Sequence, residues 1–119
     1  MIIKGVVIHG AQLGRKMGFP TANIDARDID VIENGVYLSQ VEIEGKIYKA
    51  MSNVGLRPSV DGKTRLLETH IFDFEGDLYG QAITVNLVKK IRDEQRFTTL
   101  NELQQQLRTD AAICRQEKE

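Results

Sequence analysis

The segment from Gly14 to Asn23, which reads GRKMGFPTAN, concentrates residue types that bind a polyphosphate. Glycine lets the backbone turn tightly and direct several N–H groups at one anion, and Arg15 and Lys16 add positive charge. Thr21 and Asn23 then supply neutral oxygen atoms of the kind that Mg²⁺ accepts beside phosphate groups. The segment matches neither the Walker A pattern nor the dinucleotide fingerprint. It therefore predicts a phosphate-binding loop of another kind.

The end of this segment also has a defined geometry. Pro20 fixes its own φ angle and so stiffens the approach to Thr21. Because Thr21 and Asn23 are two residues apart, they point to the same side of an extended segment. Their two oxygens are suited to anchor Mg²⁺, whereas the alternative is that they satisfy neighbouring backbone groups. The spacing alone leaves both interpretations open.

A second set of candidates lies in LETHIFDF, residues 67–74. A strand here would place two groups of side chains on opposite faces: Glu68, His70, Phe72 and Phe74 on one, and Thr69, Ile71 and Asp73 on the other. A partly desolvated Glu68 is a suitable general base, because loss of hydration raises its proton affinity. The alternative for Glu68 is an ion pair with Arg65 at the rim. For His70 a packed, hydrogen-bonded role is favoured over a catalytic one.

A third set lies in residues 90–97, KIRDEQRF. Such a charged run is usually a solvated connection. Phe97 argues against that interpretation, because an aromatic ring beside Arg92 and Arg96 can stack on a flat ligand. Tyr79, in a turn before a glycine, is either a further ligand contact or a plug for the end of the fold.

Composition narrows the class of protein. The chain has 119 residues and a formal net charge of −1, which indicates one domain and argues against a broad surface for nucleic acid or acidic membrane. The single cysteine, Cys114, excludes an internal disulfide and favours a reducing compartment. Residues 1–10 are too short an apolar run for a signal peptide or a membrane span. We therefore expect a cytoplasmic protein.

The apolar pattern predicts a mainly β fold. Five strand-like runs are separated by turn signals: residues 2–8, 36–43, 46–53, 66–74 and 82–88. After them, Leu100, Leu103, Leu107, Ala111 and Cys114 recur at helical spacing, and Thr99 with Glu102 matches a capping box. One amphipathic helix cannot cover a large open sheet. Five or six short strands that close into an antiparallel barrel, with the helix packed outside, bury the apolar faces better.

Taken together, these elements resemble the riboflavin kinase (flavokinase) family. The matching strings are GRKMGFPTAN at 14–23, NGVY at 34–37, SNVGLRP at 52–58, LETHIFDFEGDLYG at 67–80 and IRDEQRF at 91–97. The resemblance extends over nearly the whole chain in family order. It implies one riboflavin kinase domain over residues 1–119, with a six-stranded antiparallel Greek-key barrel at about 1–92 and a C-terminal helix at about 99–116.

The resemblance also implies a reaction and roles for particular residues. The reaction is Mg²⁺-dependent transfer of the γ-phosphoryl group of ATP to the 5′-hydroxyl of riboflavin, which gives FMN and ADP. The positions that correspond to nucleotide-binding residues are Gly14, Lys16, Gly18, Pro20, Thr21, Asn23, Ile71, Asp73 and Tyr79. Thr21 and Asn23 correspond to Mg²⁺ ligands and Glu68 to the general base. Flavin contacts correspond to Arg92, Gln95 and Phe97.

The chain also departs from its bacterial relatives. In most bacteria this domain follows an FMN adenylyltransferase domain, whose nucleotide-binding motifs do not occur in this sequence. We expect either a free-standing kinase or an excised domain, and we do not expect FAD synthesis by this chain alone. The second hypothesis for function is a flavin-binding sensor or carrier without turnover. The combination of Thr21, Asn23 and Glu68 favours the enzyme, because a flavin binder needs neither a metal anchor nor a base.

Overall fold

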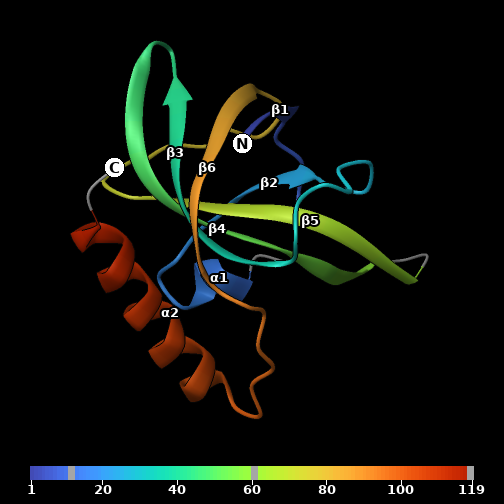
Figure 1. The fold of residues 1–119 in the computed structure, drawn as a ribbon, viewed down its shortest axis with the longest axis vertical. Coiled ribbons are helices and arrows are strands. Elements are labelled where there is room, and N and C mark those ends of the chain that lie inside the picture. The colour runs from blue at the N-terminus through green and yellow to red at the C-terminus, as the bar shows by residue number, and fades with distance from the viewer. Residues whose placement is uncertain (11–12, 60–61, 118–119) are drawn as a thin grey trace.

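The fold is a nearly closed antiparallel barrel with one helix packed outside it (Figure 1), as seen in a computed structural model. The structure describes residues 1–10, 13–59 and 62–117. Its strands are β1 (Ile2–Val6), β2 (Ala22–Asp25), β3 (Gly35–Ile43), β4 (Lys46–Ser59), β5 (Gly62–Ile71) and β6 (Ala82–Arg92). Its helices are the single turn α1 (Leu13–Lys16) and the longer α2 (Leu100–Gln116).

The strand order is β1-β6-β3-β4-β5-β2, and all neighbours are antiparallel. In this order β3, β4 and β5 form a meander and β6 returns to lie beside β3, which is the Greek-key arrangement. The two outer strands approach each other where the Ile8 N–H donates to the Asn23 carbonyl at 2.8 Å. The predicted six-stranded Greek-key barrel with a C-terminal helix is therefore confirmed.

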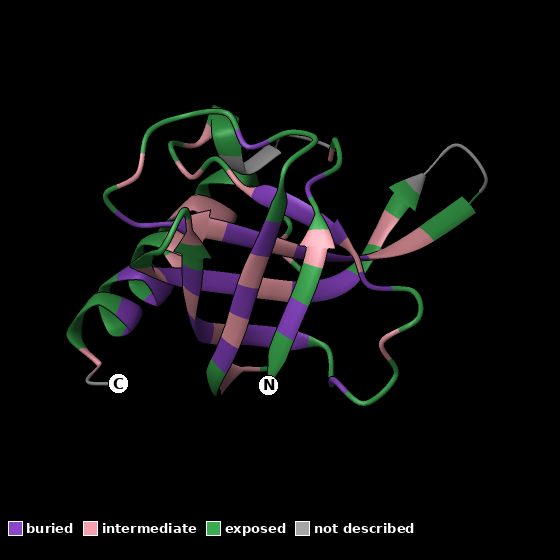
Figure 2. Ribbon diagram, turned by 90° about the horizontal axis from the view of Figure 1, so that it is seen from above, coloured by how far each residue is buried: buried purple, intermediate pink, exposed green. Residues whose placement is uncertain are grey.

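Among the described residues, three buried serine and threonine hydroxyls interrupt the apolar inner face of the barrel. Buried and more exposed residues alternate along the strands (Figure 2), as expected for a sheet with one face on a core. Ser39, Ser52 and Thr69 are almost fully buried. The Ser52 hydroxyl lies 2.7 Å from that of Ser39 and 2.8 Å from that of Thr69. These three groups satisfy one another across β3, β4 and β5, so the core contains a polar chain without unpaired hydroxyls.

Helix α2 covers part of the outer face. Its buried residues Ala111 and Cys114 pack against Leu38, Met51 and Phe72 of the barrel. The predicted cap is confirmed, because the Thr99 hydroxyl accepts from the Glu102 N–H at 3.1 Å. Leu100 departs from the predicted apolar face. It is 63% exposed, since it lies in the first turn, before the helix reaches the sheet.

A buried ion pair fixes α2 to the sheet. Asp110 is fully buried on α2, and its carboxylate accepts two hydrogen bonds from Arg92 at the end of β6, at 2.9 and 2.8 Å. The Gln106 amide donates to the same carboxylate at 3.0 Å. At the other end of the helix, the Lys49 ammonium donates to the carbonyls of Arg115 and Glu117. Cations near the last carbonyls of a helix complement its dipole.

Strand β5 ends earlier than the sequence pattern predicted. The predicted run continued to Phe74, but the strand stops at Ile71 and the chain turns at Asp73, which has a φ of 58°. Phe74 consequently leaves the face of Glu68 and packs with the inner core beside Tyr48. Strand β4 differs in the opposite sense, because it continues beyond Asn53 to Ser59.

The hydroxyl chain predicts a stability effect. Replacing Ser52→Ala leaves both Ser39 and Thr69 without their shared partner, so we expect the free energy of unfolding to fall by about 1–3 kcal/mol. Urea denaturation followed by circular dichroism measures this change. Thr109→Ala is the matched control, because that exposed hydroxyl donates only to the Gln105 carbonyl of its own helix. Equal, small effects of the two changes would contradict a structural role for the chain.

Candidate functional site

Two cavities meet at the segment that precedes and begins β2. A small cavity of about 160 Å³ lies between residues 7–10, residues 20–23 and the turn at 76–79. A large cavity of about 420 Å³ lies between the outer face of the sheet, α2 and the connection that joins β6 to α2. Thr21 lines both cavities. The arrangement therefore places one side chain at the boundary between two separate binding spaces.

Most of the residues assigned to nucleotide binding gather at the small cavity. Those that line it are Pro20, Thr21, Asn23, Ile71 and Tyr79. The other assigned side chains do not line it: Lys16 is exposed on the turn α1, Gly18 follows it with a φ of 87°, and the Asp73 carboxylate lies 3.4 Å from Arg115. Gly14 lies within α1. Arg15, whose charge belongs to the same segment, does line the cavity.

The proposed metal ligands lie next to each other. The Thr21 hydroxyl donates to the Asn23 Oδ1 at 3.1 Å, so the two side chains contact each other. Asn23 is buried. Its side chain packs directly on Gly10, and a Cβ added at residue 10 would lie only 2.3 Å from the Asn23 Nδ2. Among the described residues no group of three or more His, Cys, Asp or Glu side chains could hold a metal ion. A pair of neutral oxygens fits Mg²⁺ that takes its remaining ligands from water and phosphate.

An aromatic stack lies beside the same cavity. The rings of His9 and Tyr79 are parallel to within 15°, with centroids 3.6 Å apart. Tyr79 is half exposed, and its N–H donates to the Asp77 carboxylate at 2.9 Å. The ring therefore lies at the cavity wall. His9 was missed by sequence reasoning, because nothing near it in the sequence indicates that it meets residue 79.

The large cavity combines an apolar side with a polar side. Its residues include all three predicted flavin contacts, Arg92, Gln95 and Phe97, and the predicted base, Glu68. Apolar side chains from the sheet and from α2 face the same space: Phe19, Val36, Met51, Leu103 and Leu107. Arg92 is partly committed by its ion pair with Asp110. The cavity thus has the mixture typical of a site for an organic ligand of moderate size.

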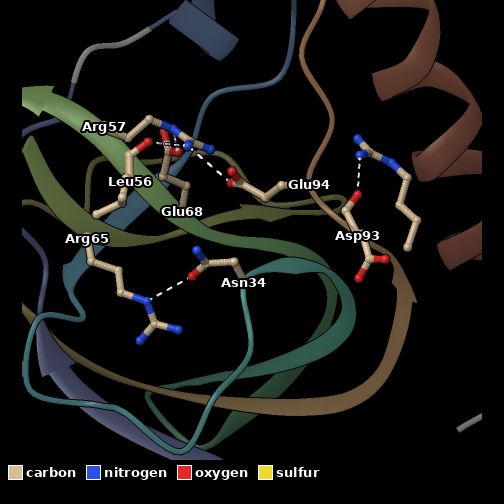
Figure 3. A network of polar contacts seen from close by, with 8 residues as sticks. Asn34, Leu56, Arg57, Arg65, Glu68, Asp93 and Glu94 are labelled. Atoms are coloured by element: carbon tan, nitrogen blue, oxygen red, sulfur yellow. Dashed lines mark hydrogen bonds and ion pairs between the residues drawn. The ribbon is translucent and has the colours of Figure 1, made fainter.

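Glu68 pairs with Arg57 and not with Arg65 (Figure 3). The Arg57 Nε donates to the Glu68 carboxylate at 2.6 Å, and another nitrogen of the same guanidinium donates to Glu94 at 3.2 Å. The Arg65 guanidinium instead donates to the Asn34 side chain at 2.9 Å and to backbone carbonyls in the loop between β2 and β3. The expected Arg65 pair is wrong because residues 65 and 68 are an odd number apart and point to opposite faces of β5.

Pairing between strands aligns the polar residues of the large cavity. In the register of the sheet, Glu68 lies directly opposite Asn23 on one side and Asn53 on the other. Asn53 in turn faces Val36, and Val36 faces Arg92. Because directly opposed residues share one face of a sheet, these five side chains form a row across β2, β5, β4, β3 and β6. We call this row the cross-strand row.

His70 links the large cavity to the segment that bears the proposed metal ligands. Its Nδ1 lies 2.8 Å from the Pro20 carbonyl, to which the N–H form donates. Burial lowers the pKa of His70, and the hydrogen bond to Pro20 opposes this by raising it. The expectation of a packed, hydrogen-bonded histidine is confirmed. The ring holds Pro20, and so the approach to Thr21, against β5.

Comparison with known proteins identifies the family of the chain. The chain matches the family model for flavokinase, described as riboflavin kinase, over residues 1–117. It is 44% identical over 115 residues to a bifunctional riboflavin kinase/FMN adenylyltransferase from Pseudomonas fluorescens, an alignment that covers 95% of this chain and 37% of that protein. A solved macrolide-efflux protein from Streptococcus pneumoniae shares 36% identity with a TM-score of 0.84, over 98% of this chain and 39% of that one.

A riboflavin kinase from Trypanosoma brucei has a TM-score of 0.66 and 25% identity, over 96% of this chain and 76% of that one. The chain therefore belongs to the riboflavin kinase family, as its sequence motifs indicated. It spans little more than a third of the Pseudomonas relative. In the part of the chain that the structure describes, no helix is long and apolar enough to cross a membrane.

The half-buried His70 predicts a pH dependence of stability. Its pKa is lowered in the folded state, so the unfolded chain binds the proton more readily. The stability that neutral His70 contributes is present above about pH 6.5, which is the usual pKa of histidine in an unfolded chain. It is lost as the pH falls through the lowered pKa of His70 in the folded state. We expect His70→Gln to remove this component, measured as the difference in melting temperature from wild type between pH 7.5 and 5.5. His9→Gln is the control that leaves the component in place, and a constant difference for His70→Gln would contradict the assignment.

The close approach at Gly10 predicts a selective binding defect. Gly10→Ala places a methyl group where the Asn23 amide lies, so Asn23 must leave the position in which it accepts from Thr21. Displacing groups that orient metal ligands typically lowers metal affinity roughly 10- to 100-fold. We expect a loss of that order in the Mg²⁺-dependent affinity for ADP, measured by calorimetry. Riboflavin affinity is the internal control, since Gly10 does not line the large cavity. Unchanged ADP affinity would show that Asn23 does not anchor the metal.

Proposed function

We propose that this chain transfers the γ-phosphoryl group of ATP to the 5′-hydroxyl of riboflavin, giving FMN and ADP. The proposal rests on the relative positions of three side chains, Thr21, Asn23 and Glu68. Thr21 lies at the boundary of the two cavities and contacts Asn23, and Asn23 lies opposite Glu68 in the strand register. A phosphoryl group held by Thr21 and Asn23 would therefore lie next to the Glu68 carboxylate, which can accept a hydrogen bond from an alcohol.

The nucleotide is assigned to the small cavity. Arg15 at its edge provides positive charge for the phosphates, and the His9–Tyr79 stack offers an aromatic surface. In this assignment the phosphates point toward Thr21 and Asn23. Gly14, Lys16, Gly18 and Asp73 keep their proposed roles as nucleotide contacts, which requires both α1 with the residues after it and the turn after β5 to approach the ligand.

Riboflavin is assigned to the large cavity. Its flat ring is apolar on both faces and suits the side formed by Val36, Leu103 and Leu107, with Arg92, Gln95 and Phe97 around it. Its polar ribityl chain then extends along the polar end of the cross-strand row. The 5′-hydroxyl reaches Glu68, which lies opposite Asn23 in the strand register.

The chemistry needs positioning more than covalent participation by the protein. Glu68 accepts a hydrogen bond from the 5′-hydroxyl, aligns its oxygen with the γ-phosphorus and takes the proton as the new O–P bond forms. The bond between the γ-phosphorus and the β–γ bridging oxygen breaks, and ADP leaves with those electrons. Arg57 holds the carboxylate in place before the substrate binds, and Glu94 gives the same guanidinium a second partner.

The residues present fit Mg²⁺ as the cofactor, with Thr21 and Asn23 as its protein ligands. When bound, Mg²⁺ neutralises charge that develops on the transferring phosphoryl group. The remaining task of Thr21 and Asn23 is orientation: their mutual hydrogen bond and the bond from His70 to the Pro20 carbonyl hold their oxygens at the boundary of the two cavities.

Two further expectations accompany the proposal. Cys114 is a free cysteine, which suits a reducing compartment such as the cytoplasm. Burial raises the pKa of its thiol to about 11, so the thiol is unreactive. The Pseudomonas relative combines a riboflavin kinase with an FMN adenylyltransferase. We infer that such a domain is a natural partner for this one, and that small molecules, not nucleic acid or membrane, are its ligands.

The central test is the variant Glu68→Gln. It keeps the size and hydrogen-bonding capacity of the side chain but cannot take a proton, so we expect the rate of FMN formation to fall roughly 10²- to 10⁴-fold. Chromatography with fluorescence detection of FMN, in the presence of ATP, Mg²⁺ and riboflavin, measures the rate. Glu42→Gln, an exposed glutamate on β3, is the matched control and retains full activity.

The outcomes separate the two functional hypotheses. Equal rates for wild type and Glu68→Gln would keep the kinase but remove Glu68 as its base. Wild-type protein that binds riboflavin yet forms no FMN would favour the flavin-binding sensor. That second hypothesis also predicts that the protein shows no Mg²⁺-dependent nucleotide binding.

A further inference from the structure

We propose that Asn53 accepts a hydrogen bond from a ribityl hydroxyl of riboflavin and so makes the site select flavins that carry the sugar chain. This inference rests on the proposed function. The starting observation is an unpaired atom: the Asn53 Oδ1 is the one buried side-chain nitrogen or oxygen among the described residues that has no hydrogen-bond partner. A buried acceptor without a partner is rare in folded proteins and calls for an explanation.

The place of Asn53 provides that explanation. It lines the large cavity, and it lies on β4 directly opposite Glu68 of β5. Directly opposed side chains of antiparallel strands have Cβ atoms about 5 Å apart. The unpaired acceptor is therefore a neighbour of the residue proposed to receive the 5′-hydroxyl. Because the Oδ1 is itself buried, the Asn53 amide must turn toward the cavity to meet a donor that enters beside that hydroxyl.

The chemistry of the unpaired atom restricts which part of the ligand it binds. A carboxamide oxygen accepts hydrogen bonds and cannot donate one. Phosphate oxygens of a nucleotide are acceptors as well, so they cannot satisfy it. The ribityl chain carries hydroxyl donors on consecutive carbons, next to the one that reacts. The flavin ring has a single N–H donor, at the edge remote from that chain.

The cross-strand row supports the same orientation. Beyond Asn53 the next member is Val36, which is apolar and buried, and after it comes Arg92. Neighbouring strands lie about 4.8 Å apart, so each step along the row moves by that distance. If the 5′-hydroxyl of riboflavin lies at Glu68, the inner ribityl hydroxyls lie beside Asn53 and the ring begins at Val36. The order of side chains matches the order of polar and apolar parts in the ligand.

The test compares two flavins that differ only in the substituent on the ring. Lumiflavin has the isoalloxazine ring with a methyl group in place of the ribityl chain. Fluorescence titration gives the dissociation constants of both for wild type, Asn53→Ala and Asn53→Asp. We expect Asn53→Ala to weaken riboflavin binding roughly five- to tenfold and lumiflavin binding less than twofold. Asn53→Asp keeps an acceptor oxygen at the same place and retains the ratio of riboflavin to lumiflavin affinity, although a second carboxylate opposite Glu68 lowers the stability of this variant.

Steady-state kinetics provides a second readout that a purely structural role would not reproduce. Asn53→Ala raises the KM for riboflavin and leaves the KM for MgATP unchanged. If Asn53→Ala does not fold, Asn53→Ser, which is polar but too short to reach the same donor, takes its place in both experiments. A melting curve for each variant separates loss of binding from loss of fold.

The outcomes distinguish this inference from the function on which it rests. If wild type prefers riboflavin and Asn53→Ala keeps the same preference, the role of Asn53 is overturned and the kinase is unaffected. If Asn53→Ala weakens both flavins equally, Asn53 contacts the ring or acts through the fold, and the inference is again overturned. If wild type binds neither flavin, the proposed function fails and this inference fails with it.

Discussion

The register of β2, β5 and β4 is the constraint on which the site depends. With a period of two along each strand, a slip of one residue would turn Glu68 into the core and move Thr69 to the surface. The hydroxyl chain of Ser39, Ser52 and Thr69 opposes such a slip, because only the observed pairing satisfies these buried groups inside the barrel. On the opposite face, the same pairing sets Asn23, Glu68 and Asn53 side by side. The core thus determines the geometry of the site.

The large cavity exists because α2 contacts the sheet over part of its length. Ala111 and Cys114 pack on the barrel, whereas Leu103 and Leu107 face the cavity. The ion pair between Asp110 and Arg92 lies between these two parts of the helix. A buried pair of this kind contributes little net stability compared with an apolar contact, but its geometry is specific. Here it holds the helix at a defined position while the adjoining space stays open for a ligand.

Local sequence signals predicted the repeating features well and the long-range contacts poorly. Alternation, turn residues and the Thr99 cap depend on neighbours in sequence, so five strands and the helix could be located. Strands β4 and β6 nevertheless extend beyond the predicted runs, and β2 was missed because its four residues are too few to show alternation. The partner of Glu68 depends on which strands pair and how far Arg57 reaches, and neither is local. The period of two could have excluded Arg65. No comparable signal indicated that the chain turns at Asp73, or that Arg15 and not Lys16 lines the small cavity.

The neutral character of the proposed metal ligands is also consistent with the register. Asn23 lies directly opposite Glu68, and a carboxylate at position 23 would place two like charges opposite each other, which destabilises an antiparallel pair. A neutral carboxamide avoids that repulsion and leaves Arg57 as the counter-charge of Glu68. In the proposed reaction this choice has a further consequence. Because Thr21 and Asn23 contribute no negative charge, the full charge of the metal remains available to the phosphates, and the nucleotide must supply most of the electrostatic attraction that holds it.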